Sequence, residues 1–170
     1  MRYLIFLILF STLLVHKPLI SQNPELISLI DRGDAFYKHR LIDSALYYFN
    51  LAVEIDSTSE EAYFRRALAR SKNNDNEGAR ADYQNAIRIN PKPVYYNNMG
   101  IILTLEECHE EALLEYDKAL ALDSNYVQAI FNKGISYHHM GMQEEACKFI
   151  GKAKEQSFQP AEQYYQQYCP

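Results

Sequence analysis

The stretch from Tyr96 to Ser124 reads YNNMGIILTLEECHEEALLEYDKALALDS. Apolar or small residues recur at three- and four-residue intervals in each half, at Tyr96, Met99, Gly100 and Leu103 and again at Ala112, Tyr116, Ala119 and Leu120. This spacing is that of one face of an α-helix. Residues 106–110 between the two halves are too few and too polar for anything but a turn, so the two helices must pack antiparallel. The stretch predicts a helical hairpin whose small residues allow close approach of the backbones.

The same hairpin pattern recurs along the chain at intervals of 33 or 34 residues. Four series carry it: Gly33, Ala67, Gly100 and Gly134; Ala45, Ala79, Ala112 and Ala146; Phe49, Tyr83, Tyr116 and Ile150; and Ala52, Ala86, Ala119 and Ala153. A period near 34 residues with this small–aromatic–small pattern is typical of a helix–turn–helix solenoid. On these residues the sequence resembles the tetratricopeptide (TPR) repeat family over about residues 24–160. The resemblance implies an all-α, right-handed α-solenoid.

The resemblance divides residues 22–170 into four helical hairpins and a C-terminal capping helix. The expected repeats are about 26–59, 60–92, 93–126 and 127–160, and the expected capping helix is 161–168. Asn23 and Pro24 predict the start of the first helix, because a cap residue is followed by proline at the first helical position. Second helices are expected at residues 44–55 and 79–89. The last second helix carries Lys154 and Gln156 where earlier ones are apolar, so we expect the array to end at the cap.

Several basic residues depart from the family pattern. Arg32, Arg66 and Lys133 stand where the family prefers leucine, and Arg70 replaces an aromatic residue or leucine. These residues make the packing of the second repeat harder to predict. Asp117 lies on the face of its helix opposite Ala112, and a change there is expected to have little effect on stability.

Residues 1–21 are expected to be a secretory signal peptide. Arg2 precedes an apolar run over residues 3–15, which is too short to cross a bilayer because spanning needs about 20 residues. Cleavage is expected after Ser21, in a protein exported to the periplasm or cell envelope of a bacterium. The alternative is an uncleaved segment that anchors the protein to the membrane. Cleavage would change the formal net charge from −5 to −7, since it removes Arg2 and Lys17. This acidic balance argues against a nucleic-acid partner.

The sequence contains no motif of an enzyme or of a cofactor site. Gly-rich phosphate loops and the patterns HExxH, GxSxG and CxxC are absent. His138 and His139 are adjacent, so on a helix their side chains diverge by ~100° and cannot bind one metal ion together. We therefore expect no catalysis, cofactor, metal or small-molecule substrate.

The resemblance places the function in a concave groove lined by the first helices of the repeats, where family members hold a peptide or helix. Mapping the family pattern onto this sequence gives the groove residues Ile30, Asp34, Phe64, Arg65, Leu68, Asn97, Asn98, Ile101, Phe131, Asn132 and Ile135. The asparagines could pair with a partner's backbone. Some family members grip a C-terminal carboxylate with a fixed set of basic and amide residues, and the corresponding positions here are Ile30, Asp34, Arg65, Val94 and Asn98. That clamp is absent. An alternative is that the apolar members only pack against adjacent repeats.

We therefore expect a non-catalytic module that binds a peptide or protein segment in its groove. The alternative is a structural scaffold or self-associating array within a larger envelope complex. Export also predicts a disulfide between Cys147 and Cys169, because the capping helix should pack antiparallel to the last second helix. Cys108, in a turn further along the solenoid, is then the thiol left over.

Overall fold

The structure, a computed structural model, describes residues 23–169. This part of the chain forms nine α-helices and no strand: α1 (Pro24–Lys38), α2 (Ile42–Ile55), α3 (Glu60–Lys72), α4 (Asn76–Ile89), α5 (Pro93–Leu105), α6 (His109–Leu122), α7 (Val127–His139), α8 (Gln143–Glu155) and α9 (Gln159–Tyr168). The expected all-α repeat fold is confirmed. The predicted signal peptide lies outside the described residues.

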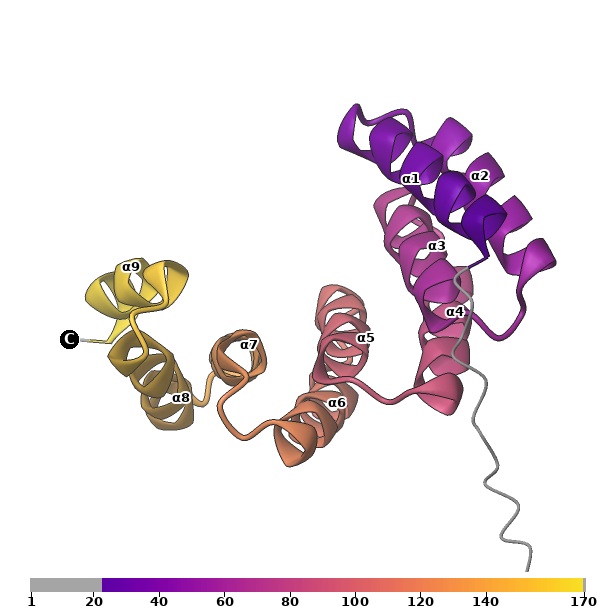
Figure 1. Cartoon of the computed structure of the whole chain (residues 1–170). Coiled ribbons are helices and arrows are strands. Elements are labelled where there is room, and N and C mark those ends of the chain that lie inside the picture. Colours follow the sequence, from indigo (N-terminus) through magenta and orange to yellow (C-terminus); the bar gives the residue numbers. More distant parts are fainter. Residues whose placement is uncertain (1–22, 170) are drawn as a thin grey trace, which may run out of the picture.

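The helices form an open arc of successive hairpins (Figure 1). Helices α1, α3, α5, α7 and α9 lie on the inner side of the arc, and α2, α4, α6 and α8 lie on the outer side. Each inner helix pairs with the outer helix that follows it, and the last inner helix, α9, has no such partner within residues 23–169. The helices expected to line a groove therefore share one face of the array.

Side-chain caps set where the helices begin. The side chains of Asn23, Ser59 and Asp75 accept hydrogen bonds from backbone N–H groups in the first turns of α1, α3 and α4. Such a bond satisfies a donor that has no partner inside the helix. Helices α2, α4 and α9 begin two or three residues before the expected starts at residues 44, 79 and 161. Their first turns are largely polar or half-exposed, so apolar periodicity does not reveal them.

In the turn inside each hairpin, the second residue after the end of the first helix has the left-handed backbone conformation. The residues are Arg40 (φ 62°), Asn74 (φ 63°), Glu107 (φ 62°) and Gly141 (φ 75°). This conformation lets the next backbone N–H reach back into the helix, as Leu41 does to the carbonyl of Phe36 at 3.0 Å. Glycine suits this conformation at residue 141, because it has no Cβ. The other three turns adopt it without glycine.

Large rings fill the space that the small residues leave inside each hairpin. Ala112 and Ala119 are fully buried, and a Cβ on Gly100 would lie 2.5 Å from the Tyr116 ring. The Tyr116 hydroxyl lies 3.0 Å from the Oγ1 atom of Thr104, which also meets Ser136 on α7 at 2.9 Å. Burial raises the pKa of Tyr116 to about 12, so the phenol stays neutral. The ring therefore packs as core while its hydroxyl remains paired.

The basic residues of the second repeat bind one buried aspartate. Asp82 on α4 is only 1% exposed. Arg66 donates to its two oxygens at 2.9 and 2.8 Å, and Arg70 donates to Oδ2 at 2.9 Å. Arg66 also reaches Asn50 on the preceding hairpin at 3.1 Å. Arg66 and Arg70, which depart from the family pattern, are thus paired with an acidic residue on the facing helix.

Lys133 is accommodated in the same way, and this corrects the expectation for Asp117. Lys133 is buried on α7 and forms an ion pair with Asp117 on α6. The Asp117 side chain is 55% exposed, but the Lys133 side chain whose charge it neutralises is only 10% exposed. A buried charge that loses its partner is costly. A change at Asp117 is therefore expected to affect stability. Ala121, an exposed alanine on the same helix, is a position where a substitution should have little effect.

Replacing Ala112 by leucine should lower the free energy of unfolding by roughly 1–3 kcal/mol, because the larger side chain overpacks a fully buried contact. Ala121→Leu makes the same chemical change at an exposed site of α6, and it should shift stability by less than about 0.5 kcal/mol. Urea unfolding of both variants measures the difference. Equal unfolding midpoints for the two would show that the register assigned to α6 is wrong.

Candidate functional site

The inner face of the arc presents side chains in matching positions on successive helices. Three positions recur, each one helical turn apart: Arg65, Leu68 and Lys72 on α3; Asn98, Ile101 and Leu105 on α5; and Asn132, Ile135 and His139 on α7. All nine residues are half-buried or exposed. Because the repeat length is nearly constant, equivalent residues form rows that cross the inner helices.

One pocket of about 190 Å³ opens between the first three inner helices. It is lined by Tyr37, Leu68, Ser71, Lys72, Tyr83, Asn98, Ile101 and Ile102. Three of these, Leu68, Asn98 and Ile101, are among the groove residues expected from the sequence. Sequence reasoning missed Tyr37, Ser71 and Lys72. Ser71 and Lys72 lie one helical turn after Leu68 on the same face of α3, so the helix spacing could have identified them. The pocket combines aliphatic and aromatic walls with an amide and an ammonium group.

Two expected groove residues with opposite charges are brought together by α1 and α3. Arg65 on α3 lies 3.5 Å from Asp34 on α1, and it also donates to Glu61 at 2.6 Å. Partial burial raises the pKa of Asp34, and Arg65 opposes that shift. The positive charge of Arg65 is thus used within the protein.

Asn97 is not a groove residue, which corrects the sequence-based prediction. It is only 3% exposed, and it accepts a 2.9 Å hydrogen bond from the amide of Asn132 on α7. Its own amide donates to Asn98 at 3.4 Å. One residue along a helix turns the side chain by ~100°, which moves Asn97 from the groove into the α5–α7 contact. Asn98 and Asn132 remain half-buried.

The apolar residues expected in the groove divide into two groups. Phe64 packs between Tyr83 and Tyr95, with ring centroids 6.3 and 5.2 Å away, and Phe131 packs against Phe158 at 5.4 Å. For these two phenylalanines, packing against other aromatic rings accounts for the position. The others are Leu68 and Ile101, which line the pocket; Ile135, which packs against the C-terminal core; and Ile30, which is half-buried on α1 outside the pocket.

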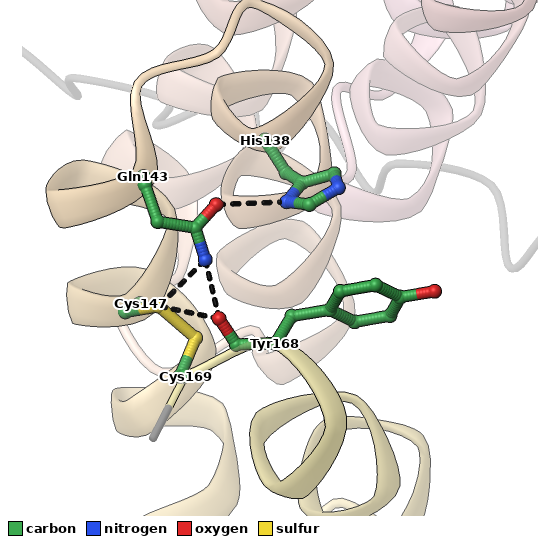
Figure 2. The surroundings of a disulfide bond; sticks show 5 residues. All are labelled: His138, Gln143, Cys147, Tyr168 and Cys169. Atoms are coloured by element: carbon green, nitrogen blue, oxygen red, sulfur yellow. Dashed lines mark hydrogen bonds between the residues drawn. A yellow bond between two sulfur atoms is a disulfide. The ribbon is translucent and has the colours of Figure 1, made fainter.

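The C-terminal end of the array is tied by a disulfide in this structure. Cys147 on α8 is joined to Cys169 at the end of α9, with their Cα atoms 5.5 Å apart (Figure 2). The Gln143 amide donates to the backbone carbonyl of Tyr168, and its oxygen lies 3.1 Å from Nδ1 of His138. These contacts hold the end of α9 against α7 and α8. Cys108 is the free cysteine among residues 23–169.

Neither a metal centre nor a membrane-spanning helix is found in the part of the chain that the structure describes. Within residues 23–169 no three His, Cys, Asp or Glu side chains come together as metal ligands. No helix in this range is both long and apolar enough to cross a bilayer. His109 and His139 instead stack with ring centroids 5.4 Å apart.

Comparison with known proteins identifies the repeats. Two family models described as tetratricopeptide repeat match residues 60–93 and 115–148. The photosystem I assembly protein Ycf3 of Acaryochloris marina is 30% identical over 109 residues, which cover 60% of this chain and 65% of that protein. The chain thus spans less than two thirds of this relative, and 22% of the human tetratricopeptide repeat protein 6 that it also matches.

Solved structures share the fold over most of the chain. The crystal structure of MamA superposes with a TM-score of 0.72 at 25% identity, covering 82% of this chain and 83% of that one. The structure of YrrB, a TPR protein with an unusual peptide-binding site, matches with a TM-score of 0.65 at 24% identity. The match covers 81% of this chain and 72% of the YrrB chain. The likeness to YrrB is one of fold. The repeating hairpins and the two family-model matches identify the chain as a protein that contains tetratricopeptide repeats.

Proposed function

We propose that the chain is a non-catalytic module that binds a segment of another protein in the groove formed by α1, α3, α5 and α7. TPR proteins are generally interaction modules. The observation that carries the proposal is the pocket between α1, α3 and α5, where Leu68 and Ile101 present apolar surface beside the Asn98 amide. Full burial of one apolar side chain of the partner contributes roughly 1.5–3 kcal/mol to the free energy of binding. The partner therefore supplies at least one apolar side chain to this pocket.

The proposed location is the envelope of a bacterium, reached by export with residues 1–21 as a cleaved signal peptide. The sequence of that segment supports export, and an oxidising compartment would maintain the bond between Cys147 and Cys169. We therefore propose that this disulfide forms in the native protein.

Export predicts that the mature protein isolated from its own host begins near Gln22. Intact-mass and N-terminal peptide spectrometry of the folded protein measures this directly. Recovery of the protein with residues 1–21 still attached would instead indicate an uncleaved anchor.

A second candidate function is a scaffold that self-associates through the outer face. Exposed apolar side chains on the outer helices favour it, since Leu114 on α6 is 61% exposed and Tyr47 on α2 is 60% exposed. Exposed apolar surface often marks an interaction site. In this arrangement the groove would stay empty, and oligomer size would rise with protein concentration.

Site-specific photo-crosslinking distinguishes the two functions with a matched pair of exposed leucines. A photoreactive residue replaces Leu105, 73% exposed at the end of inner helix α5, or Leu114 on outer helix α6. Groove binding predicts crosslinks to a second protein species from position 105, with few from position 114. Crosslinks only from position 114, to a second copy of the chain, would assign the scaffold function. An absence of products from both positions would contradict the groove proposal.

A further inference from the structure

We infer that the partner segment carries an acidic residue next to an apolar or aromatic residue, with the apolar side chain in the pocket and the acidic side chain bound to Lys72. This inference rests on the proposed groove function and specifies the chemistry of the occupant. The pocket lining and the charges around the pocket support it.

The pocket itself favours a neutral, apolar side chain. None of the residues that line it is acidic, and Leu68, Ile101 and Ile102 provide aliphatic walls. Tyr83 contributes a ring, and burial raises the pKa of its phenol, so the ring stays uncharged. A volume of about 190 Å³ accommodates a leucine, methionine or phenylalanine side chain, whereas a cationic group would lose its hydration there and find no acidic residue in the lining.

The charge that remains available at the pocket is positive. Lys72 lies exposed at the last turn of α3, lines the pocket, and takes part in none of the ion pairs found within residues 23–169. Lys38 occupies the matching place at the end of α1, next to the pocket residue Tyr37, and is likewise exposed and unpaired in that range. Arg65, about one helical turn before the pocket residue Leu68 on α3, is already paired with Asp34. Two free ammonium groups therefore face the solvent at one lip of the groove.

These lysines stand out because the surrounding protein is acidic. The whole chain has a formal net charge of −5, and α5, which forms one wall of the pocket, has no charged residue. A carboxylate on the partner is attracted locally to Lys72 and Lys38, while the net negative charge of the chain repels it. Electrostatic complementarity of this kind adds specificity more than raw affinity. It selects where along the groove an acidic segment docks.

The carboxylate is assigned to an acidic side chain within a longer segment. Gripping a terminal carboxylate needs several donors around it, but the positions that serve this in related repeats hold Ile30 and Val94 here. A lysine is a single point charge, which suits one acidic side chain. The inner helices also continue past the pocket to α7 and α9, so the segment has surface to follow on that side.

A random-peptide phage library panned on oxidised residues 22–170 tests the inference. Peptides fused at their C-terminus to the coat protein have no free terminal carboxylate. The enriched sequences should place Asp or Glu beside Leu, Ile, Met or Phe. The strongest binder, synthesised with an amidated C-terminus, should bind Lys72→Glu about tenfold more weakly than the parent protein. Exchanging its acidic residue for lysine should restore binding to Lys72→Glu.

Lys148→Glu is the matched control, because it makes the same charge change at an exposed site on outer helix α8. It should leave the affinity within about twofold. Enriched peptides without an acidic residue, or equal affinities for parent and Lys72→Glu, would overturn the inference while leaving groove binding in place. Failure to enrich any peptide would contradict the proposed function as well. Matching circular dichroism melting curves confirm that both variants are folded.

Discussion

Replacing Asp82 by alanine is expected to lower the free energy of unfolding by roughly 3 kcal/mol, because it removes the buried carboxylate that two half-buried arginines share. Asp82 is 1% exposed and accepts hydrogen bonds from both Arg66 and Arg70. Without it, Arg66 would lose its carboxylate partner, and Arg70 would keep only its 3.5 Å contact with Asp75. Urea unfolding followed by circular dichroism measures the loss.

The matched control is Glu77→Ala, which removes an exposed carboxylate from the same helix and should change stability by less than about 0.5 kcal/mol. A second variant tests the mechanism. Replacing Asp82, Arg66 and Arg70 together by leucine should recover most of the stability, because apolar residues of similar size often substitute for a buried ion network. If Asp82→Ala unfolds at the same urea concentration as Glu77→Ala, the network does not stabilise the second repeat.

Removing the disulfide is expected to cost roughly 3 kcal/mol on the chain-entropy model for a loop of this length. The two cysteines are 22 residues apart in sequence, and the bond ties the end of α9 to α8. In Cys147→Ser/Cys169→Ser, amide hydrogens of α9 should exchange faster, because the helix loses its covalent tether. Cys108→Ser should leave both exchange and stability unchanged.

Thiol counting on the unreduced, denatured protein tests whether the bond forms at all. One free thiol, mapped to Cys108, would support it. Three free thiols after preparation under oxidising conditions would contradict it, and with it the link between the disulfide and export.

The cap that this bond secures covers the last apolar face of the array. Ala161 on α9 is fully buried against the fourth repeat, and Phe158, Tyr164 and Tyr165 pack around the same core. Detaching α9 would expose this surface to water. The disulfide therefore stabilises the end of the solenoid, where the terminal unit has a neighbour on one side only.

The amino-acid sequence by itself determined the hairpins and the two sides of the arc. Spacing along one helix face depends on the geometry of a single helix, so the sequence alone assigns Gly100, Ala112 and Tyr116 to a close contact. The repeat period then carries that assignment to every hairpin. Asn23 and Pro24 locate the first helix because capping depends on neighbouring residues alone.

Tertiary structure decided which side chains were left to act in the groove. Asn97 and Asn98 are adjacent in sequence, yet the first is buried against α7 and the second lines the pocket. The pairing of Asp82 with two arginines depends on how α3 and α4 face each other. Helix spacing alone does not specify the rotation of each helix about its axis or the partners that meet across it. These follow from packing of residues far apart in the chain, and that packing left Lys72 unpaired at the pocket among residues 23–169.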